Sequence, residues 1–278
     1  MLDTEPAFDQ DSSNPLLDDS LIDDSAAESS SKVRLRRRVL VGLLVLCLLV
    51  VMWLTQQVLT EETSEPTIDL LPSIKFEQSL NELRRQESDK LHIEDFVVDD
   101  RMMQQLENYP NLETIIFDRG EVTDSGLAVL QSLPELTHLR LRRSPISDEG
   151  FKTLAKCRSL WFVNLPHATC TAAGVAELSK IPELRQLRLG SPNLGNEVTR
   201  EIATLTTLRG VHLVDIPVTD EGLKTLAALP YLESLYLDNS AVTEAGWRWV
   251  YIHHPELHVH VNQHHNDYDP KYHKHHDD

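Results

Sequence analysis

The chain has 278 residues, of which 41% are hydrophobic, and its formal net charge at pH 7 is −18. This length suits one domain of ordinary size with appendages and argues against several large domains. The pI near 5.1 argues against nucleic acid as a partner, and three cysteines are too few for a disulfide scaffold.

The first 31 residues form a distinct acidic segment. Residues 1–31 contain nine acidic residues and no lysine or arginine. Ser, Asp and Pro dominate the stretch, which offers few apolar side chains for burial, so we expect a disordered acidic tail. The pairs Leu16–Leu17 and Leu21–Ile22 leave a short docking motif open as an alternative to a purely solubilising tail.

A basic cluster and an apolar run follow the tail. Five lysine and arginine residues lie within 32–38, and sixteen apolar residues occupy 39–54. A membrane-spanning helix needs about 20 mostly apolar residues, a length that the run reaches by continuing through residues 55–60. The alternative, a cleaved signal peptide, is disfavoured because no A-x-A-like site follows the apolar core. We therefore expect a transmembrane signal anchor over residues 32–60.

The basic residues lie only on the N-terminal side of this run. The positive-inside rule then predicts a cytoplasmic acidic tail at 1–31 and an extracytoplasmic location for everything after residue 60. The expected membrane topology is single-pass. Residues 61–87 are polar and are expected to form a stalk that is helical in part.

From residue 88 the sequence repeats with a period of 24, in frames that begin at residues 88, 112, 136, 160, 184, 208 and 232. The shared pattern is L-x-x-L-x-L-x-x-x-x-V-T-D-x-G-L-x-x-L-x-x-L-P-x. The L-x-L alternation predicts a short strand, and the second half has helical spacing. One repeat cannot bury its own leucines, so we expect stacked repeats with a shared core. Thr or Ser before the helical half should cap helices, with Asp in the first turn, at Thr123, Ser147, Thr219, Thr243, Asp124, Asp148 and Asp220.

This pattern resembles the leucine-rich-repeat family, in particular its ribonuclease-inhibitor-like type with V-T-D-x-G-L-x-x-L-x-x-L-P repeats. The resemblance covers residues 88–262 and implies parallel strands on a concave side and helices on a convex side. Two departures are the missing Asn or Cys at the ninth position and the 184 frame, which lacks the Gly and the closing Pro. The expected fold class is an α/β leucine-rich-repeat solenoid preceded by one transmembrane helix, and Trp247, Trp249 and Tyr251 are expected to close its C-terminal end.

The frame also predicts which side chains face the concave surface. The first, fourth and sixth positions should be buried, and the second, third, fifth, seventh and eighth should face outward. In the central frames the outward residues are cationic and aromatic, and acids stand in the flanking frames at Glu113, Asp118, Glu233 and Asp238. The candidate ligand-binding residues are His138, Arg140, Arg142, Arg143, Trp161, Phe162, Arg185, Arg188, Arg209 and His212.

Arg and Trp at the centre of a rigid surface are typical of binding hot spots, and Arg suits bidentate contact with carboxylate or phosphate. The ligand would be anionic, either an acidic protein segment or a phosphorylated or acidic glycan. The alternative is that the alternating charges only solvate the sheet.

The C-terminal segment 253–278 holds nine of the thirteen histidines. Imidazoles, together with Asp267 and Asp269, suit zinc, copper or nickel. No spacing matches a known metal-site fingerprint, so the prediction rests on composition. Residues 263–278 are expected to be a His/Asp-rich tail, and the candidate metal ligands are His258, His260, His264, His265, His273, His275 and His276.

No catalytic motif is present: the sequence lacks G-x-S-x-G, H-E-x-x-H, C-x-x-C, a P-loop and a dinucleotide-binding fingerprint. We therefore expect a protein that is not an enzyme and needs no cofactor. Cys157 and Cys170 should face one core, either as a disulfide or as two small buried residues. The predicted function is binding of a protein or other anionic ligand by the concave face of a membrane-anchored, extracytoplasmic solenoid. The alternative is an exported metal-binding protein that uses its C-terminal histidines.

Overall fold

The computed structural model describes residues 37, 39–53 and 71–265, and the chain divides into two units at residues 69 and 70. In the first unit residues 39–53 form a helix whose side chains are all exposed. None of the helices in the described residues is both long enough and apolar enough to cross a membrane, so the expected transmembrane helix is not found among them. The acidic tail, residues 54–70 and residues 266–278 lie outside the described residues.

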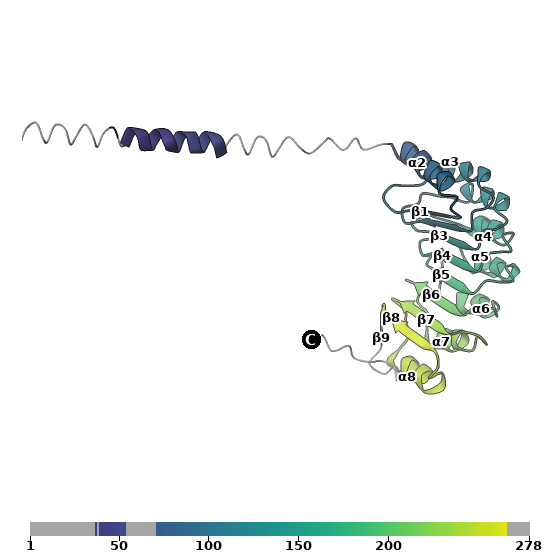
Figure 1. Cartoon of the computed structure of the whole chain (residues 1–278). Helices are drawn as coiled ribbons and strands as arrows, with labels where there is room; N and C mark the ends of the chain where they lie inside the picture. The colour runs from purple at the N-terminus through teal and green to yellow at the C-terminus, as the bar shows by residue number, and fades with distance from the viewer. Residues whose placement is uncertain (1–36, 38, 54–70, 266–278) are drawn as a thin grey trace, which may run out of the picture. The chain divides into compact units, whose positions relative to one another are not determined.

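The second unit is a curved α/β solenoid built on one sheet of nine strands (Figure 1). The strands are neighbours in chain order; β1 to β8 pair in parallel, and β9 is antiparallel to β8. Paired residues in the parallel part lie 24 apart, as Arg140 and Asn164 do, which confirms the repeat frame and the parallel sheet. The strands are β1 (Lys90–Ile93), β2 (Thr114–Phe117), β3 (His138–Leu141), β4 (Phe162–Leu165), β5 (Gln186–Leu189), β6 (Gly210–Val214), β7 (Ser234–Asp238), β8 (His258–Val261) and β9 (His264–His265).

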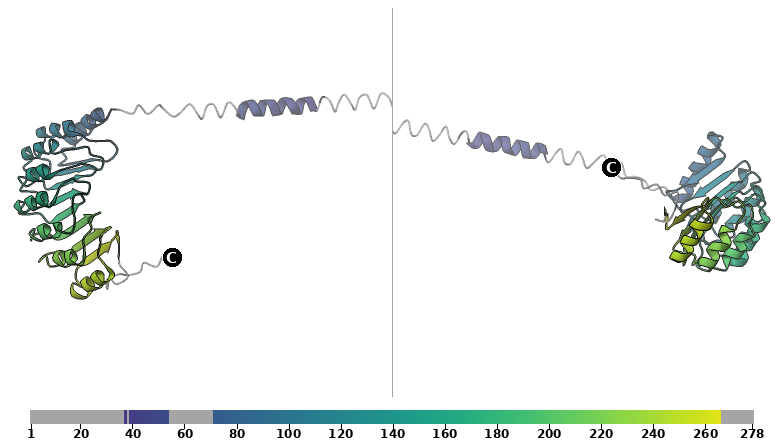
Figure 2. Two further views of the ribbon diagram at one scale, coloured as in Figure 1. Left: turned by 180° about the vertical axis from the view of Figure 1, so that it is seen from behind. Right: turned by 90° about the horizontal axis from the view of Figure 1, so that it is seen from below.

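Short helices connect the strands and line the convex side of the solenoid (Figure 2). The core lies between the two layers, and Leu136, Leu139 and Leu141 are buried in it, as the frame predicts for the first, fourth and sixth positions. The connecting helices are α3 (Asp100–Gln104), η1 (Gln105–Asn108), η2 (Gly126–Ser132), α4 (Asp148–Leu154), α5 (Ala172–Glu177), η3 (Leu178–Lys180), α6 (Val198–Ala203), α7 (Asp220–Ala227) and α8 (Glu244–His253).

Helix α2 (Pro72–Arg85) covers the N-terminal end of the core, where a stalk was expected. Its apolar side chains Phe76, Leu80 and Leu83 are spaced for one helical face and are buried. The ring of Phe76 meets the ring of Phe117 edge to face, with centroids 6.4 Å apart. The solenoid therefore begins before residue 88, because the first strand needs an apolar cover that it cannot supply itself.

The C-terminal end is closed by α8 and by a hairpin. Trp247 and Tyr251 of α8 are buried, and Trp249 is packed against the same core. After β8, Asn262 and Gln263 both have positive φ, at 51° and 66°, which is the two-residue turn that suits a tight hairpin. Strand β9 thus extends the sheet past residue 262, into the segment that was expected to be a His/Asp-rich tail.

The expected helix caps form in part. Ser147 and Thr243 accept backbone N–H bonds at the starts of α4 and α8, and Thr171 does the same for α5. Thr219 accepts no such bond. Thr123 accepts the N–H of Ser125 at 3.3 Å, but η2 begins only after Ser125. The threonines are held by the preceding repeat, which fixes their position whether or not a cap forms.

The two internal cysteines are buried as free thiols, so the disulfide is not formed. Burial raises the pKa of Cys157 to about 11 and that of Cys170 to about 12. Both therefore stay protonated at neutral pH and act as small core residues.

Candidate functional site: the concave face of the sheet

The strand register aligns the outward residues in two columns across the sheet. Residues two apart on a strand point to the same face, so both columns lie on one surface. The third-position column runs through Lys90, Thr114, His138, Phe162, Gln186, Gly210, Ser234 and His258. The fifth-position column runs through His92, Ile116, Arg140, Asn164, Arg188, His212, Tyr236 and His260. The candidate residues on the strands are thus brought together on the concave face.

Three rings form one cluster at the centre of this face. The His138 imidazole stacks on Phe162 with centroids 3.8 Å apart and planes 9° apart, and Trp161 lies edge-on to both rings. Burial, followed by the charges of Lys90 and Arg140, lowers the pKa of His138. His138 is therefore neutral at pH 7, and the cluster presents an apolar surface between the arginines.

Asp118 neutralises part of the expected cationic patch. Its Oδ1 lies 2.6 Å from Arg140 Nη2 and 3.7 Å from Arg142 Nη1, and its Oδ2 lies 3.1 Å from His92 Nε2. Burial raises the pKa of Asp118, but the hydrogen bond from His92 and the charges of the two arginines outweigh it and hold the pKa below its usual value. This flanking acid therefore joins the patch as a partner.

Two more of the arginines are also paired. Arg209 Nη1 lies 2.7 Å from a Glu233 carboxylate oxygen, and Arg185 Nη2 lies 2.9 Å from one of Glu183. These four groups are at least half exposed, so each pair contributes little to stability and exchanges readily. The patch is consequently less cationic than its list of arginines suggests.

Arg188 and Arg143 form no ion pair with any residue that the structure describes. Burial, followed by the charge of Arg142, lowers the pKa of Arg188, although a guanidinium stays charged at any physiological pH. Its Nε is buried without a hydrogen-bond partner, as is Oδ1 of the neighbouring Asn164. Buried polar atoms without partners are uncommon, so Arg188 has hydrogen-bonding capacity that the described residues do not use.

Arg143 follows strand β3 and is exposed, with its backbone in the left-handed region at φ 60°. Its N–H donates to His167 Nδ1 at 3.2 Å. Burial, then the charges of Arg142, Arg143 and Arg188, lowers the pKa of His167. The depressed pKa agrees with a positive potential at this edge of the face.

Two hollows lie side by side on the concave face and share Gln186. The first has a volume of about 340 Å³ and is lined by Ser159, Trp161, Glu183, Arg185, Gln186 and Arg209. The second has a volume of about 220 Å³ and is lined by Phe162, Asn164, Gln186, Leu187, Arg188, Val211, His212, Ser234 and Tyr236. Six of the ten candidate residues line one of these hollows, and a seventh, His138, stacks on Phe162 of the second hollow.

The second hollow includes Tyr236, which the search for cations and aromatics in the central frames did not select. Its ring stacks on His212, with centroids 5.3 Å apart, and His212 Nε2 lies 2.8 Å from Asp238 Oδ2. Burial lowers the pKa of His212 more than the hydrogen bond to Asp238 raises it. Tyr236 occupies the fifth position of the 232 frame, in the same column as Arg188 and His212. Extending the fifth-position column to that frame identifies it from sequence.

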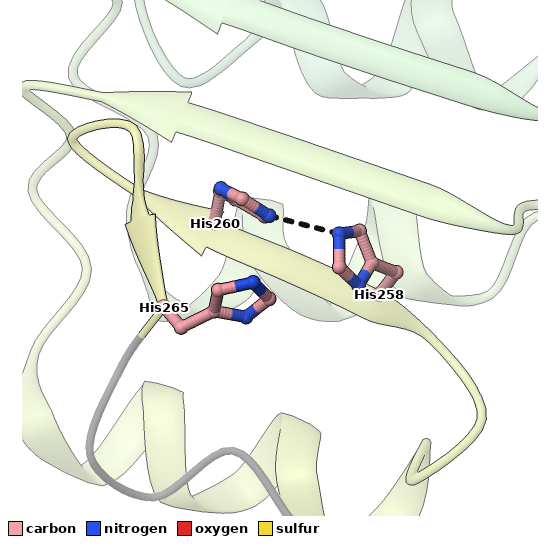
Figure 3. Close-up of side chains that lie close together, drawn as sticks. All are labelled: His258, His260 and His265. Carbon is pink, nitrogen blue, oxygen red and sulfur yellow. Dashed lines mark hydrogen bonds between the residues drawn. The ribbon is translucent and has the colours of Figure 1, made fainter. Parts of the chain in front are cut away.

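The structure separates the candidate metal ligands. The side chains of His258, His260 and His265 converge, with one ring nitrogen from each within 4.8 Å of the others (Figure 3). His264 is exposed and is not part of this group. His273, His275 and His276 lie outside the described residues. At the opposite end of the sheet, His92, Glu94 and Asp118 form a second close group that sequence reasoning missed.

No protein-family model and no curated protein matches the sequence. Among solved structures, the chain is similar to a leucine-rich-repeat protein of Leptospira interrogans, with a TM-score of 0.41 and 19% identity over 56% of this chain and 45% of that one. It is also similar to an internalin of Listeria monocytogenes, with a TM-score of 0.41 and 15% identity over 64% of this chain and 62% of that one. The match therefore spans less than two thirds of the length of either protein.

Proposed function

We propose that this chain binds an acidic protein segment through its concave face, with Arg188 at the centre of the contact. The observation that carries the proposal is the position of Arg188 in a hollow lined by Phe162 and Tyr236. Arg188 forms no ion pair within 4.0 Å among the described residues, although the charge of Asp238 acts on it. A partly desolvated guanidinium beside aromatic rings contributes strongly when a carboxylate binds it in bidentate fashion.

The backbone of Arg143 supports the same interpretation. Left-handed φ costs a residue with a long side chain about 1 kcal/mol, and Asn, Asp or Gly relieves the cost. Two other repeats place Asp215 and Asn239 at the equivalent position, both with positive φ. An arginine here is unfavourable for the turn, which favours a role for its side chain in binding.

The shape of the face favours an extended segment over a single small anion. The two hollows adjoin at Gln186, and the columns cross neighbouring strands spaced about 4.8 Å apart. An extended acidic peptide could place one carboxylate near Arg188 and others near Arg185 and Arg209, displacing Glu183 and Glu233. An acidic glycan is the competing outcome of the experiment below.

We further propose that the solenoid is displayed on the extracytoplasmic side of a membrane by a single-pass anchor. The support is the basic cluster at 32–38 directly before the apolar run 39–54, which is the arrangement that keeps an N-terminus cytoplasmic. Protease added to intact cells should remove the solenoid and spare an epitope placed at residue 1. Protection of the solenoid would contradict this topology.

Crosslinking with mass spectrometry on cells that express the full chain tests the binding proposal. We expect acidic peptides of a partner to crosslink near β4–β6 and to be lost in Arg188→Glu. The matched control is Arg101→Glu, the same charge change at an exposed position of convex helix α3. An unchanged set of crosslinks in Arg188→Glu would mean that the arginines only solvate the sheet. Loss of a glycan adduct, instead of a peptide, would mean that the ligand is an acidic glycan.

A further inference from the structure

The hairpin at the C-terminal end of the sheet brings three histidines together on the concave face. His258 and His260 are two residues apart on β8, and His265 of β9 is paired directly with His260. All three therefore lie on the same side of an ordered sheet. This arrangement differs from the flexible His-rich tail that composition predicts, because the ligand positions are set by strand pairing.

The hairpin is held to the rest of the solenoid by polar contacts. The N–H of Asn239 donates to Asn262 Oδ1 at 2.7 Å, and Gln263 Nε2 donates to Asp238 Oδ2 at 3.4 Å. The ring of Tyr236 packs against His260, with centroids 4.5 Å apart. The two hydrogen bonds hold the turn between β8 and β9 in place, and Tyr236 restricts the imidazole of His260. Support of this kind around metal ligands raises affinity.

The distances between the imidazoles suit one transition-metal ion. His260 Nε2 lies 2.8 Å from His258 Nε2, and the His265 ring centroid lies 4.2 Å from that of His260 and 5.0 Å from that of His258 (Figure 3). Two nitrogens bound to a tetrahedral zinc at about 2.0–2.1 Å are about 3.3 Å apart. A small outward movement of His258 and His260 would therefore admit the ion between them.

We propose that His258, His260 and His265 bind one divalent transition-metal ion, with zinc as the reference ion. Three imidazoles provide a nitrogen donor set that suits zinc, copper and nickel, whereas magnesium and calcium require oxygen ligands. Three protein ligands leave a fourth tetrahedral position for water or an incoming donor atom. The bound ion would add positive charge at the end of the column that contains His212 and Arg188.

Metal titration of the full chain, purified and stripped with a chelator, tests this site without any partner protein. We expect calorimetry with zinc to give one tight site per chain, and cobalt to give the intense visible absorption of a tetrahedral complex. His258→Ala/His260→Ala/His265→Ala removes every proposed ligand and should abolish the one-to-one site and the cobalt spectrum. Circular dichroism of the metal-free variants checks that the solenoid remains folded, and the milder His260→Gln should weaken binding in the same direction.

The control is a variant that removes the other C-terminal histidines, His264→Ala/His273→Ala/His275→Ala/His276→Ala. It should retain the tight site and the cobalt spectrum. A chain truncated after Asn262 keeps two of the three ligands and should lose the tetrahedral spectrum. The proposal is overturned if the control variant loses binding while the triple variant keeps it, or if wild type shows no saturable one-to-one site. Because only metal is added, either result leaves the binding proposal for Arg188 untouched.

Discussion

The carboxylate of Asp148 binds Thr171 of the next repeat twice. Its Oδ1 accepts the backbone N–H of Thr171 at 2.7 Å, and its Oδ2 accepts the hydroxyl at 2.8 Å. Gly174 lies beside the same carboxylate, and a Cβ there would overlap it. The T-D-x-G motif is therefore a contact between repeats: the Asp of one repeat requires the Thr and the Gly of the next. The same double contact joins Asp100 to Thr123, Asp124 to Ser147 and Asp220 to Thr243. At the remaining position Asn196 Oδ1 alone accepts both the N–H and the hydroxyl of Thr219.

The one interruption of this series explains the degraded 184 frame. The 160 frame has Ala172 at the Asp position, so it offers no carboxylate to the following repeat. That repeat has Gly195 where Thr is usual and Val198 where Gly is usual. Because Ala172 offers no acceptor, the next repeat needs no Thr hydroxyl at position 195. Because Ala172 has no carboxylate to overlap with, the larger side chain of Val198 fits where Gly is usual.

Breaking the Asp148 contact should destabilise the solenoid. We expect Asp148→Ala to lower the free energy of unfolding by about 1–3 kcal/mol, because it leaves a backbone N–H without its acceptor. Gly174→Ala should also destabilise, through overlap with the carboxylate. In the double variant the overlap is partly removed, so its loss should be smaller than the sum of the two. Denaturant unfolding measures all three, with the exposed Glu135→Ala as control; strict additivity would contradict the contact.

The N-terminal cover should matter as much as a core position. Phe76→Ala should cost about 3–5 kcal/mol, because Phe76 is fully buried against Phe117. Hydrogen exchange should then accelerate first in β1 and β2, next to α2. Equal acceleration of hydrogen exchange in all strands would argue against α2 as a local cap. An unchanged free energy of unfolding and unchanged exchange would mean that α2 does not contribute to the core.

The internal cysteines should be unreactive in the folded protein. Burial raises their pKa to about 11 for Cys157 and about 12 for Cys170, so the reactive thiolate is scarce at pH 8. In a Cys47→Ala chain, a thiol reagent should label neither residue under native conditions and both after denaturation. Fast native labelling of either thiol would show that its part of the core opens.

Stability should fall as the pH is lowered through about 6.5. The folded-state pKa of His138 lies below its usual value because of burial and the charges of Lys90 and Arg140. The unfolded chain therefore takes up this proton first, and its uptake favours unfolding until the folded pKa is reached. Chemical unfolding between pH 7.5 and 5 should show a shallower decline for His138→Gln than for wild type. Parallel curves would mean that His138 titrates alike in both states.

Replacing Arg143 should separate stability from binding. Arg143→Asn suits the left-handed backbone better and should raise the free energy of unfolding by up to about 1 kcal/mol. If Arg143 contacts the partner, the same variant should reduce crosslinking. A variant that is more stable and crosslinks normally would remove Arg143 from the site.

The repeat pattern alone determined the architecture of the central repeats. The spacing of the leucines predicts strand, helix and a 24-residue register, because each repeat must bury the same positions against its neighbours. That register then places His138, Arg140 and Arg188 on one face, as the frame predicts. Two other positions that the frame assigns to the outer surface, Asn164 and Ser191, are buried.

Only the tertiary structure decided which of those side chains are available. The pairing of Arg140 with Asp118 depends on side chains crossing between strands, and α2 joins the core without sharing the repeat. The convergence of His258, His260 and His265 required a hairpin that reverses the chain after residue 261. A repeat pattern predicts only which residues of neighbouring parallel strands pair, one period apart. It does not predict which side chains form ion pairs or where the chain turns back into a hairpin. Those contacts define both candidate sites.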